Sequence, residues 1–379
     1  MRIYFSGGGG LKDTPEVLIP NRDPHIMLTY HQIHDRQKSA ISRLKKHLHP
    51  QTYHPEIKAR SESIFVDSGA HSLYNIHVLK HGERKGEHGR LLAKPPVRWS
   101  QGDFSYYDLS RGSEFRAYCD AYARFMRRMI PRKVLCANVD AISNPDLTWE
   151  IQRYFEEEHG VQPIPIVHYG TPMTYVDRYI EAGRYPLLGV GGLGQGVSRH
   201  EYFSWADIFF CHICPESHDF RPLIKTHGFA MTSWELICRY PWWSVDSATW
   251  VKLSAYGWLY VPRRTERGKG WDFNTPPVMV NFSFRSPRLK ERQKHFKNIP
   301  PSSQRDCLDW LRHMGLEMGS VADDGEVVEV GVSSHHRARS YANLYYLKEL
   351  EASRPEWPHP LDRSLVKGSS VIYRRGFGL

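Results

Sequence analysis

Short, uniformly apolar segments alternate with helical patterns along most of this chain, and this alternation limits the possible folds more than any other feature. Strands buried on both faces read as continuous apolar runs, whereas half-exposed strands alternate between apolar and polar residues. Eight parallel strands with helices between them predict a (β/α)8 TIM barrel, and a doubly wound open sheet is the alternative. The eight candidate strands are Arg2–Phe5, Ile64–Val66, Val134–Val139, Ile164–His168, Leu187–Val190, Leu223–Thr226, Trp243–Val245 and Val278–Phe282.

Local signals predict where several helices begin and end. Asn144 before Pro145 combines a capping side chain with a proline at the first helical position. Residues 174–182 form a second helical pattern, followed by a glycine. Ser303 and Asp306 have the spacing of a capping box, so a helix is expected to start there. These signals place helices between the predicted strands.

Length and charge predict the domain organisation and the kind of partner. The chain has 379 residues, a formal net charge of +10 and 13% aromatic residues. We expect one TIM-barrel domain over residues 1–300, with basic insertions at about 31–60 and 80–98, and a small helical or mixed appendage over residues 301–379. A basic, aromatic-rich chain is typical of proteins that bind a polyanion with stacking bases. With no 18-residue apolar run and no signal-peptide pattern, we expect a cytoplasmic protein without a membrane span.

Carboxylates follow three of the predicted strands. Asp67 lies in VDSGAHS, Asp140 in ANVDAISNP and Asp246 in SVDSATW. The carboxyl ends of barrel strands meet at one mouth, so these side chains are expected to converge there. Converging carboxylates suggest displacement at a sugar carbon, in which one carboxylate attacks and a second passes the proton. We interpret Asp246 as the nucleophile.

The order of these motifs resembles the tRNA-guanine transglycosylase superfamily, and most closely its phage-type 7-deazaguanine DNA transglycosylases. The resemblance rests on VDSGAHS, the Asp140 segment, LGVGGLG, and the pairing of His227-Gly228 with SVDS. It implies a TIM-barrel enzyme that exchanges guanine in DNA for a 7-deazaguanine such as 7-cyano-7-deazaguanine. Such a modification protects DNA against restriction, and the chemistry requires no redox or nucleotide cofactor.

The resemblance also implies a role for each matching residue. Asp246 would attack C1′ of a guanosine nucleotide and form a covalent sugar ester. Asp67 would act as general acid and base, and Asp140 would read the exocyclic amine and ring N–H of the base. Gly191 and Gly192 would offer backbone donors to the base carbonyl. Further candidates for base binding are Ser68, Gly69, His71, His168 and His227.

Extruding a base from a duplex requires basic clamps and aromatic wedges. The candidate DNA-binding residues are the basic side chains of loops, namely Arg43, Lys45, Lys46, Arg84, Lys85, Arg263 and Arg264. The candidate wedges are Tyr106, Tyr107, Trp242, Trp243 and Trp250.

The usual zinc motif of the family, which follows the nucleophile, is missing from this sequence. Cys211 and Cys214, with His218, lie upstream and are a candidate structural zinc site, with ordinary buried thiols as the alternative. The missing motif favours DNA over RNA as the polymer.

Two other functions remain open from the sequence. The first is the same exchange chemistry on tRNA. The second is a metal-dependent TIM-barrel hydrolase, in which His168, His227 and Asp246 would be the metal ligands.

Overall fold

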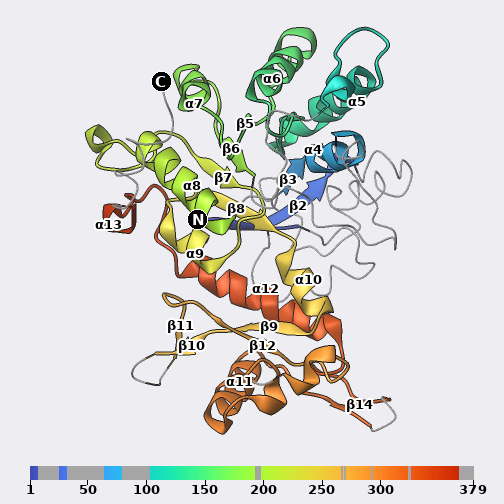
Figure 1. Ribbon diagram of the computed structural model, residues 1–379, viewed down its shortest axis with the longest axis vertical. Helices are drawn as coiled ribbons and strands as arrows, with labels where there is room; N and C mark the ends of the chain where they lie inside the picture. Colours follow the sequence, from blue (N-terminus) through green and yellow to red (C-terminus); the bar gives the residue numbers. More distant parts are fainter. Residues whose placement is uncertain are drawn as a thin grey trace. The chain divides into compact units, whose positions relative to one another are not determined.

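The computed structural model describes residues 1–6, 25–31, 64–78, 103–192, 198–265, 268, 270–291, 293–322 and 326–366. Within these ranges, the chain forms an α/β fold with a curled, open sheet of eight parallel strands (Figure 1). The strand order is β4-β3-β2-β1-β8-β7-β6-β5. These strands are β1 (Arg2–Phe5), β2 (His25–Thr29), β3 (Ile64–Asp67), β4 (Leu135–Cys136), β5 (Ile166–His168), β6 (Leu188–Gly191), β7 (Thr226–Gly228) and β8 (Ser244–Ser247). The predicted α/β class with a parallel sheet is confirmed.

The two edge strands of this sheet, β4 and β5, approach each other just beyond β4. A single parallel bridge joins Ala137 to Ile164. The Asn138 N–H donates to the Ile164 carbonyl at 2.9 Å, and the Ile164 N–H donates to the Cys136 carbonyl at 2.8 Å. This contact is an isolated bridge and not a continuous strand ladder. The sheet therefore curls like a barrel, but the barrel is not closed by strand pairing between β4 and β5.

One predicted strand lies in another sheet, one strand was missed, and the predicted strand Leu223–Thr226 shares only Thr226 with β7. The predicted barrel strand at residues 278–282 forms β12 (Val278–Asn281), which pairs antiparallel with β9 (Trp258–Val261) in a separate sheet. The place in the large sheet belongs to β2, whose sequence HIMLT was not recognised. β2 was missed because Met and Leu are as common in helices as in strands. The strand at residues 278–282 was misplaced because an apolar run indicates that a segment is buried but not which strand it pairs with.

The helices that alternate with the strands bury one apolar face each. They include α4 (Ala70–Leu73), α5 (Glu114–Met129), α6 (Pro145–His159), α7 (Met173–Glu181) and α8 (Arg199–Ile213). In α5, Phe115, Tyr118, Tyr122 and Met126 recur at helical spacing and are buried. α5 packs against β4, and α6 packs against β5.

The helix starts were predicted with mixed success. The Asn144 side chain caps α6 by accepting from the Leu147 N–H at 3.1 Å, as predicted. The capping box at Ser303 was wrong, because α11 (Pro301–His313) begins two residues earlier, with Pro301 in its first turn. Proline at the first helical position already has the φ angle of a helix and lacks the N–H that a cap would satisfy.

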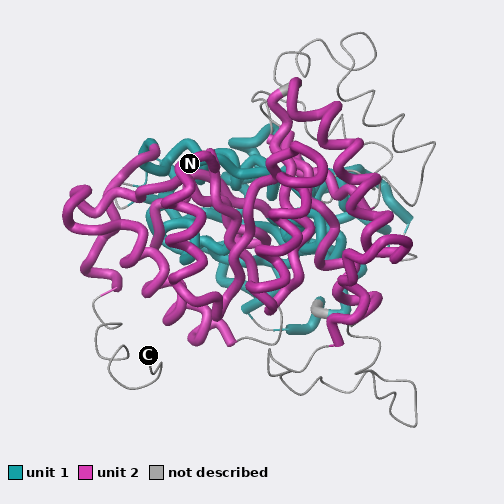
Figure 2. The backbone as a smooth tube through the Cα atoms, turned by 90° about the horizontal axis from the view of Figure 1, so that it is seen from above, with its two compact units in different colours: residues 1–24, 232–238, 247–356 teal, residues 25–231, 239–246, 357–379 magenta. Residues whose placement is uncertain are grey.

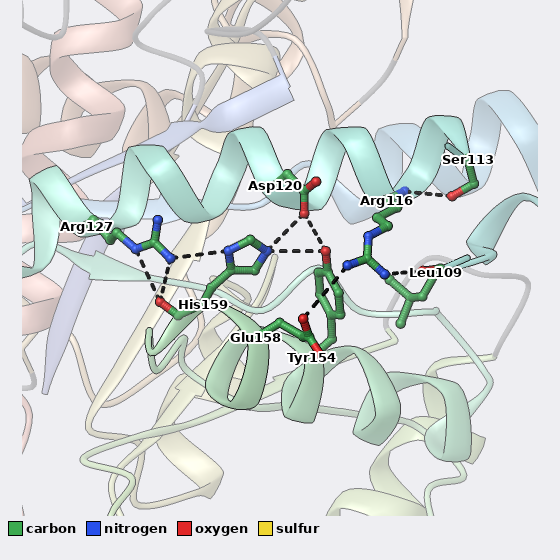
Figure 3. A network of polar contacts seen from close by, with 8 residues as sticks. All are labelled: Leu109, Ser113, Arg116, Asp120, Arg127, Tyr154, Glu158 and His159. Carbon is green, nitrogen blue, oxygen red and sulfur yellow. Dashed lines mark hydrogen bonds and ion pairs between the residues drawn. The ribbon is translucent and has the colours of Figure 1, made fainter. Parts of the chain in front are cut away.

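A polar network joins α5 to α6 (Figure 3). The Asp120 carboxylate of α5 accepts a hydrogen bond from the Tyr154 hydroxyl and lies 2.9 Å from Nε2 of His159. In the same network, Arg127 of α5 donates to the backbone carbonyl of His159 in α6 at 2.7 Å. These contacts fix the two helices that flank β4 and the segment carrying Asp140.

The chain forms two compact units (Figure 2). Unit 1 comprises Met1–Pro24, Thr232–Cys238 and Ser247–Glu356, and unit 2 comprises His25–Met231, Arg239–Asp246 and Trp357–Leu379. The predicted domain boundary at residue 300 stays a prediction. The remaining elements are α9 (Trp234–Arg239), α10 (Thr249–Ala255), β10 (Arg263–Arg264), β11 (Trp271–Asp272), β13 (Ser320–Val321), β14 (Val327–Glu329), α12 (His336–Ala352) and α13 (Arg363–Val366).

Within unit 1, the buried Asn343 side chain of α12 donates to the carbonyls of Trp250 and Trp258, at 3.2 and 3.0 Å. It thereby ties α12 to α10 and β9. None of the helices in the described ranges has the length and apolar character needed to cross a bilayer.

Candidate active site

Asp67 is the last residue of β3, and the turn that follows holds its carboxylate. Its register partner on β2 is Thr29. The Thr29 side chain and the Gly69 N–H both hydrogen-bond the carboxylate. Gly69 has a φ of 87°, and a Cβ at this position would lie 2.4 Å from Cβ of His31. Glycine is therefore required in the DSGA turn, both for the backbone angle and for space.

The neighbouring residues of this turn differ in their placement. Ser68 is fully buried, and its carbonyl accepts a hydrogen bond from the Tyr118 hydroxyl of α5 at 2.6 Å. Tyr118 was not recognised from the sequence, since only its helical spacing marks it. His71 is exposed on α4, so its predicted part in base binding stays a prediction.

Asp140 is paired with His168 across the ends of neighbouring segments. Nε2 of His168 lies 2.8 Å from Oδ2 of Asp140, and both side chains are about nine-tenths buried. Gly191 is the register partner of His168, and a Cβ there would lie 3.0 Å from the imidazole Cδ2. Gly192 has a φ of 108°, and a Cβ there would lie 2.7 Å from the Tyr169 nitrogen. The two glycines thus let β6 pack closely against the residues that hold Asp140.

Asp246 is buried at the end of β8, and its Oδ1 contacts Ala230 and His227. The Ala230 N–H donates to Oδ1 at 3.0 Å, and Nε2 of His227 lies 3.4 Å away. Ala230 adopts a φ of 61°, which is unusual for a residue with a side chain and turns its N–H toward the carboxylate. Nδ1 of His227 lies 2.8 Å from the Ser244 hydroxyl. When Ser244 donates to Nδ1, the imidazole carries its proton on Nε2 and presents it to Asp246.

The surroundings of His227 keep its imidazole neutral. The ring is fully buried, and its centroid lies 4.6 Å from the ring centroids of both Phe65 and Phe229. Burial lowers the pKa of His227, although the neighbouring Asp246 opposes this shift. The negative charge of Asp246 is therefore not cancelled by an imidazolium ion.

Three carboxylates influence one another at this end of the sheet. The pKa of Asp67 is raised to about 7, first by burial and then by the negative charges of Asp140 and Asp246. Charge repulsion of this kind weakens with distance, so the three groups lie around one region. At neutral pH, Asp67 is poised to gain or lose a proton.

The chain matches no protein-family model, and no curated protein matches it in sequence. These comparisons assign no family to the chain.

Most of the predicted DNA-binding residues, Arg43, Lys45, Lys46, Arg84 and Lys85, lie outside the described residues. Arg263 is exposed on β10. The guanidinium group of Arg264 lies 3.3 Å from Asp306, forms an ion pair with Asp309 and lies 4.2 Å from the Trp271 ring centroid. Arg264 thus has intramolecular partners that compete with a phosphate.

The wedge predictions fail for three aromatic residues. Trp242, Trp250 and Tyr107 are at most 2% exposed, so they belong to the core and cannot enter a base stack without unfolding. Tyr106 and Trp243 are only partly buried. Large aromatic side chains near strands are often core residues, and sequence alone does not show which way they face.

The predicted zinc site finds no support. Among the described residues, no group of three or more His, Cys, Asp and Glu side chains is placed to hold a metal ion, and this includes Cys211, Cys214 and His218. Cys214 is fully buried, and burial raises its pKa to about 12.

The raised pKa of Asp67 predicts a specific dependence of stability on pH. The native state keeps a proton that the unfolded chain loses above pH 4, so the free energy of unfolding falls as pH rises from about 4 to 7. This group alone is expected to lower it by about 4 kcal/mol over that window. Urea unfolding of the wild type and of Asp67→Asn at pH 4 and pH 8 measures this contribution, because titrating groups that do not interact with Asp67 cancel in the comparison. Equal pH dependence in both proteins would disprove the raised pKa.

Proposed function

We propose that this protein is a transglycosylase that exchanges guanine in DNA for a 7-deazaguanine base, on a scaffold of the TIM-barrel type. The observation that carries the proposal is the proximity of Asp67, Asp140 and Asp246, with the pKa of Asp67 raised to about 7, first by burial and then by the charges of the other two. Displacement at a glycosidic carbon needs one ionised and one protonated carboxyl, and different surroundings provide both at one pH.

In the first half of the reaction, Asp246 acts as the nucleophile. A carboxylate oxygen of Asp246 attacks C1′, in a side chain whose Oδ1 accepts the Ala230 N–H. The C1′–N9 bond breaks, its electron pair leaves with guanine, and protonated Asp67 gives a proton to the departing base. An ester between Asp246 and C1′ remains.

In the second half, the ionised Asp67 removes the N9 proton of the incoming 7-deazaguanine. N9 attacks C1′ from the side that guanine left, and the ester bond breaks to restore the Asp246 carboxylate. Both protein carboxyls return to their starting states, and two displacements retain the configuration at C1′. No cofactor enters this scheme.

Asp140 is suited to select guanine-like bases. Its side chain is held by His168, so its orientation is set before a base arrives. A carboxylate that faces the N–H edge of a purine accepts from both the exocyclic amine and the ring N–H, which adenine cannot offer. The resemblance supplies the 7-deaza identity of the incoming base.

The choice of DNA over tRNA rests on the missing zinc motif and on the lack of an evident RNA-binding appendage in the sequence, while the net charge of +10 suits either polyanion. The metal-dependent hydrolase is less well supported. No group of three or more side chains that could bind a metal ion is found among the described residues, and His168 and His227 contact different carboxylates, those of Asp140 and Asp246.

The test is to incubate the purified protein with radiolabelled 7-cyano-7-deazaguanine and either plasmid DNA or tRNA. Label is expected in DNA, and nucleoside mass spectrometry of the digest should show the deazapurine nucleoside. Label in tRNA alone would replace DNA with tRNA in the proposal, and label in neither polymer would refute the exchange reaction.

A further inference from the structure

His227 and Asp246 come together from two neighbouring strands of the large sheet. Ser244 of β8 is the register partner of His227 on β7, and Asp246 lies two residues further along β8. Residues two apart on a strand point to the same face of a sheet, so Ser244 and Asp246 lie on one side of β8. The imidazole spans them, with Nδ1 2.8 Å from the Ser244 hydroxyl and Nε2 3.4 Å from Oδ1 of Asp246.

Burial separates the two members of this pair. His227 is fully buried, and its ring packs against the rings of Phe65 and Phe229. Asp246 keeps 5% of its surface exposed, so it is the member that a substrate can reach. A chemical role for His227 therefore acts through Asp246.

The charge of Asp246 determines which nitrogen of the imidazole carries the proton. A lone pair on Nε2 would face the carboxylate and be repelled, whereas an N–H at this position is attracted. The proton of the neutral ring is therefore on Nε2, and Nδ1 accepts a hydrogen bond from the Ser244 hydroxyl. A hydrogen bond at one ring nitrogen sets the tautomer, so Ser244 keeps the N–H of His227 directed at the carboxylate.

Two donors converge on Oδ1 of Asp246. The Ala230 N–H donates to it at 3.0 Å, and the Nε2 of His227 lies at 3.4 Å, which is long for a hydrogen bond. Catalytic hydrogen bonds are often long in a free enzyme and shorten in the reacting complex. The negative charge of a carboxylate is shared by its two oxygens, so donors at Oδ1 stabilise Asp246 as an anion.

We propose that His227, held by Ser244, is a positioning residue that stabilises Asp246 as the leaving group when the covalent intermediate breaks down. This inference rests on the proposed function. In this step N9 of the incoming base attacks C1′, the bond between C1′ and the Asp246 oxygen breaks, and its electron pair returns to the carboxylate. The N9 proton passes to Asp67, and the Nε2 proton stays on His227. A donor already in place where negative charge develops lowers the barrier of the step.

The same donor has the opposite effect on ester formation. It stabilises the free carboxylate of Asp246 and so makes this group a weaker nucleophile. Loss of the donor should therefore slow breakdown of the ester without slowing its formation, and the covalent adduct should accumulate. A substitution that only disturbs the packing of the site would slow both steps, and the adduct would not accumulate.

The test measures the two steps separately. Each protein is mixed with labelled DNA, 7-cyano-7-deazaguanine is then added, and the adduct is followed by denaturing electrophoresis. His227→Met replaces the imidazole with an apolar side chain of similar volume. It should form the adduct at least as fast as the wild type and lose it about 10–100-fold more slowly, the scale of a hydrogen bond to a charged group. His227→Gln keeps an N–H donor and should restore breakdown close to the wild-type rate.

Ser244→Ala tests the same role with the imidazole still present, and it removes little volume. It should slow breakdown of the adduct about fivefold, the scale of one ordinary hydrogen bond. It should have no further effect in the His227→Met protein, because Ser244 acts through the ring. His295→Met is the matched control, since His295 is also fully buried but its Nε2 lies 3.2 Å from the Ser283 carbonyl and not beside a carboxylate. That variant should leave both rates unchanged.

The outcomes distinguish failure of this role from failure of the proposed function. If the wild type forms no adduct, the transglycosylase is refuted and the role of His227 with it. If the adduct forms but breaks down at equal rates in the His227→Met and His227→Gln proteins, the role alone is refuted. Nitrogen NMR of the free protein that places the His227 proton on Nδ1 would also overturn the role, with no substrate required.

Discussion

Asp246→Asn is expected to lower the rate of base exchange by about 10⁴-fold or more, the scale on which enzymes lose activity with their nucleophile. Asparagine keeps the shape of the side chain, and its carbonyl can still accept the Ala230 N–H that now reaches Oδ1 at 3.0 Å. The amide cannot form the ester with C1′. The fold should therefore persist while the covalent intermediate disappears.

The measurement is denaturing electrophoresis of the protein mixed with labelled DNA, where the wild type should show a covalent adduct. Asp207→Asn is the matched control, because Asp207 is a buried carboxylate that pairs with Arg239 at 2.6 Å in the same unit. That variant should be less stable yet still form the adduct. Exchange by the Asp246→Asn protein at a tenth of the wild-type rate would show that another group attacks C1′.

Asp67→Asn is expected to slow exchange by about 10²–10⁴-fold, the usual contribution of a general acid or base. Asparagine cannot give a proton to departing guanine or take one from the incoming base. In the wild type, the rate of guanine release should fall as pH rises above about 7, because Asp67 must be protonated for this step and its pKa is raised to about 7. The variant should lack this pH dependence.

A substrate whose base leaves without protonation distinguishes this role from a structural one. The 7-methylguanine nucleotide already carries a positive charge on the base, so the Asp67→Asn protein should release it and form the Asp246 ester at a rate within about tenfold of the wild type. Gly69→Ala serves as a comparison, since it disturbs the same turn through the 2.4 Å approach to His31 without removing the acid. An Asp67→Asn protein that is equally slow with both substrates would mean that the residue only supports the pocket.

The sequence predicted four strands of the large sheet and the residues at their carboxyl ends. Apolar runs identified β3, β5, β6 and β8, and the residues just after them proved to be the polar groups of the candidate site, including Asp67 and Asp246. The run at residues 278–282 failed, because its burial comes from an antiparallel partner in another sheet. β2 was missed because Met27 and Leu28, which are equally common in helices, separate its two β-branched residues, Ile26 and Thr29.

The partners of the three aspartates could not be predicted. No motif links Asp140 to His168 or Tyr118 to Ser68, because these contacts join segments that lie 28 and 50 residues apart in sequence. The backbone angle of Ala230 could not be predicted either, because a φ of 61° is unusual for alanine and no sequence pattern indicates it. Contacts of this kind depend on the register between neighbouring strands and on helix packing.

The sequence by itself determined that buried parallel strands deliver Asp67, Asp140 and Asp246 to one end of a sheet, because local hydrophobicity fixes which segments are buried and where they stop. Only the tertiary structure decided that Asp140 is held by His168, that a neutral His227 faces Asp246, and that Asp67 titrates near neutrality. The physical reason is that a pKa depends on burial and on the distance to other charges. Neither quantity exists until segments distant in the chain have packed together.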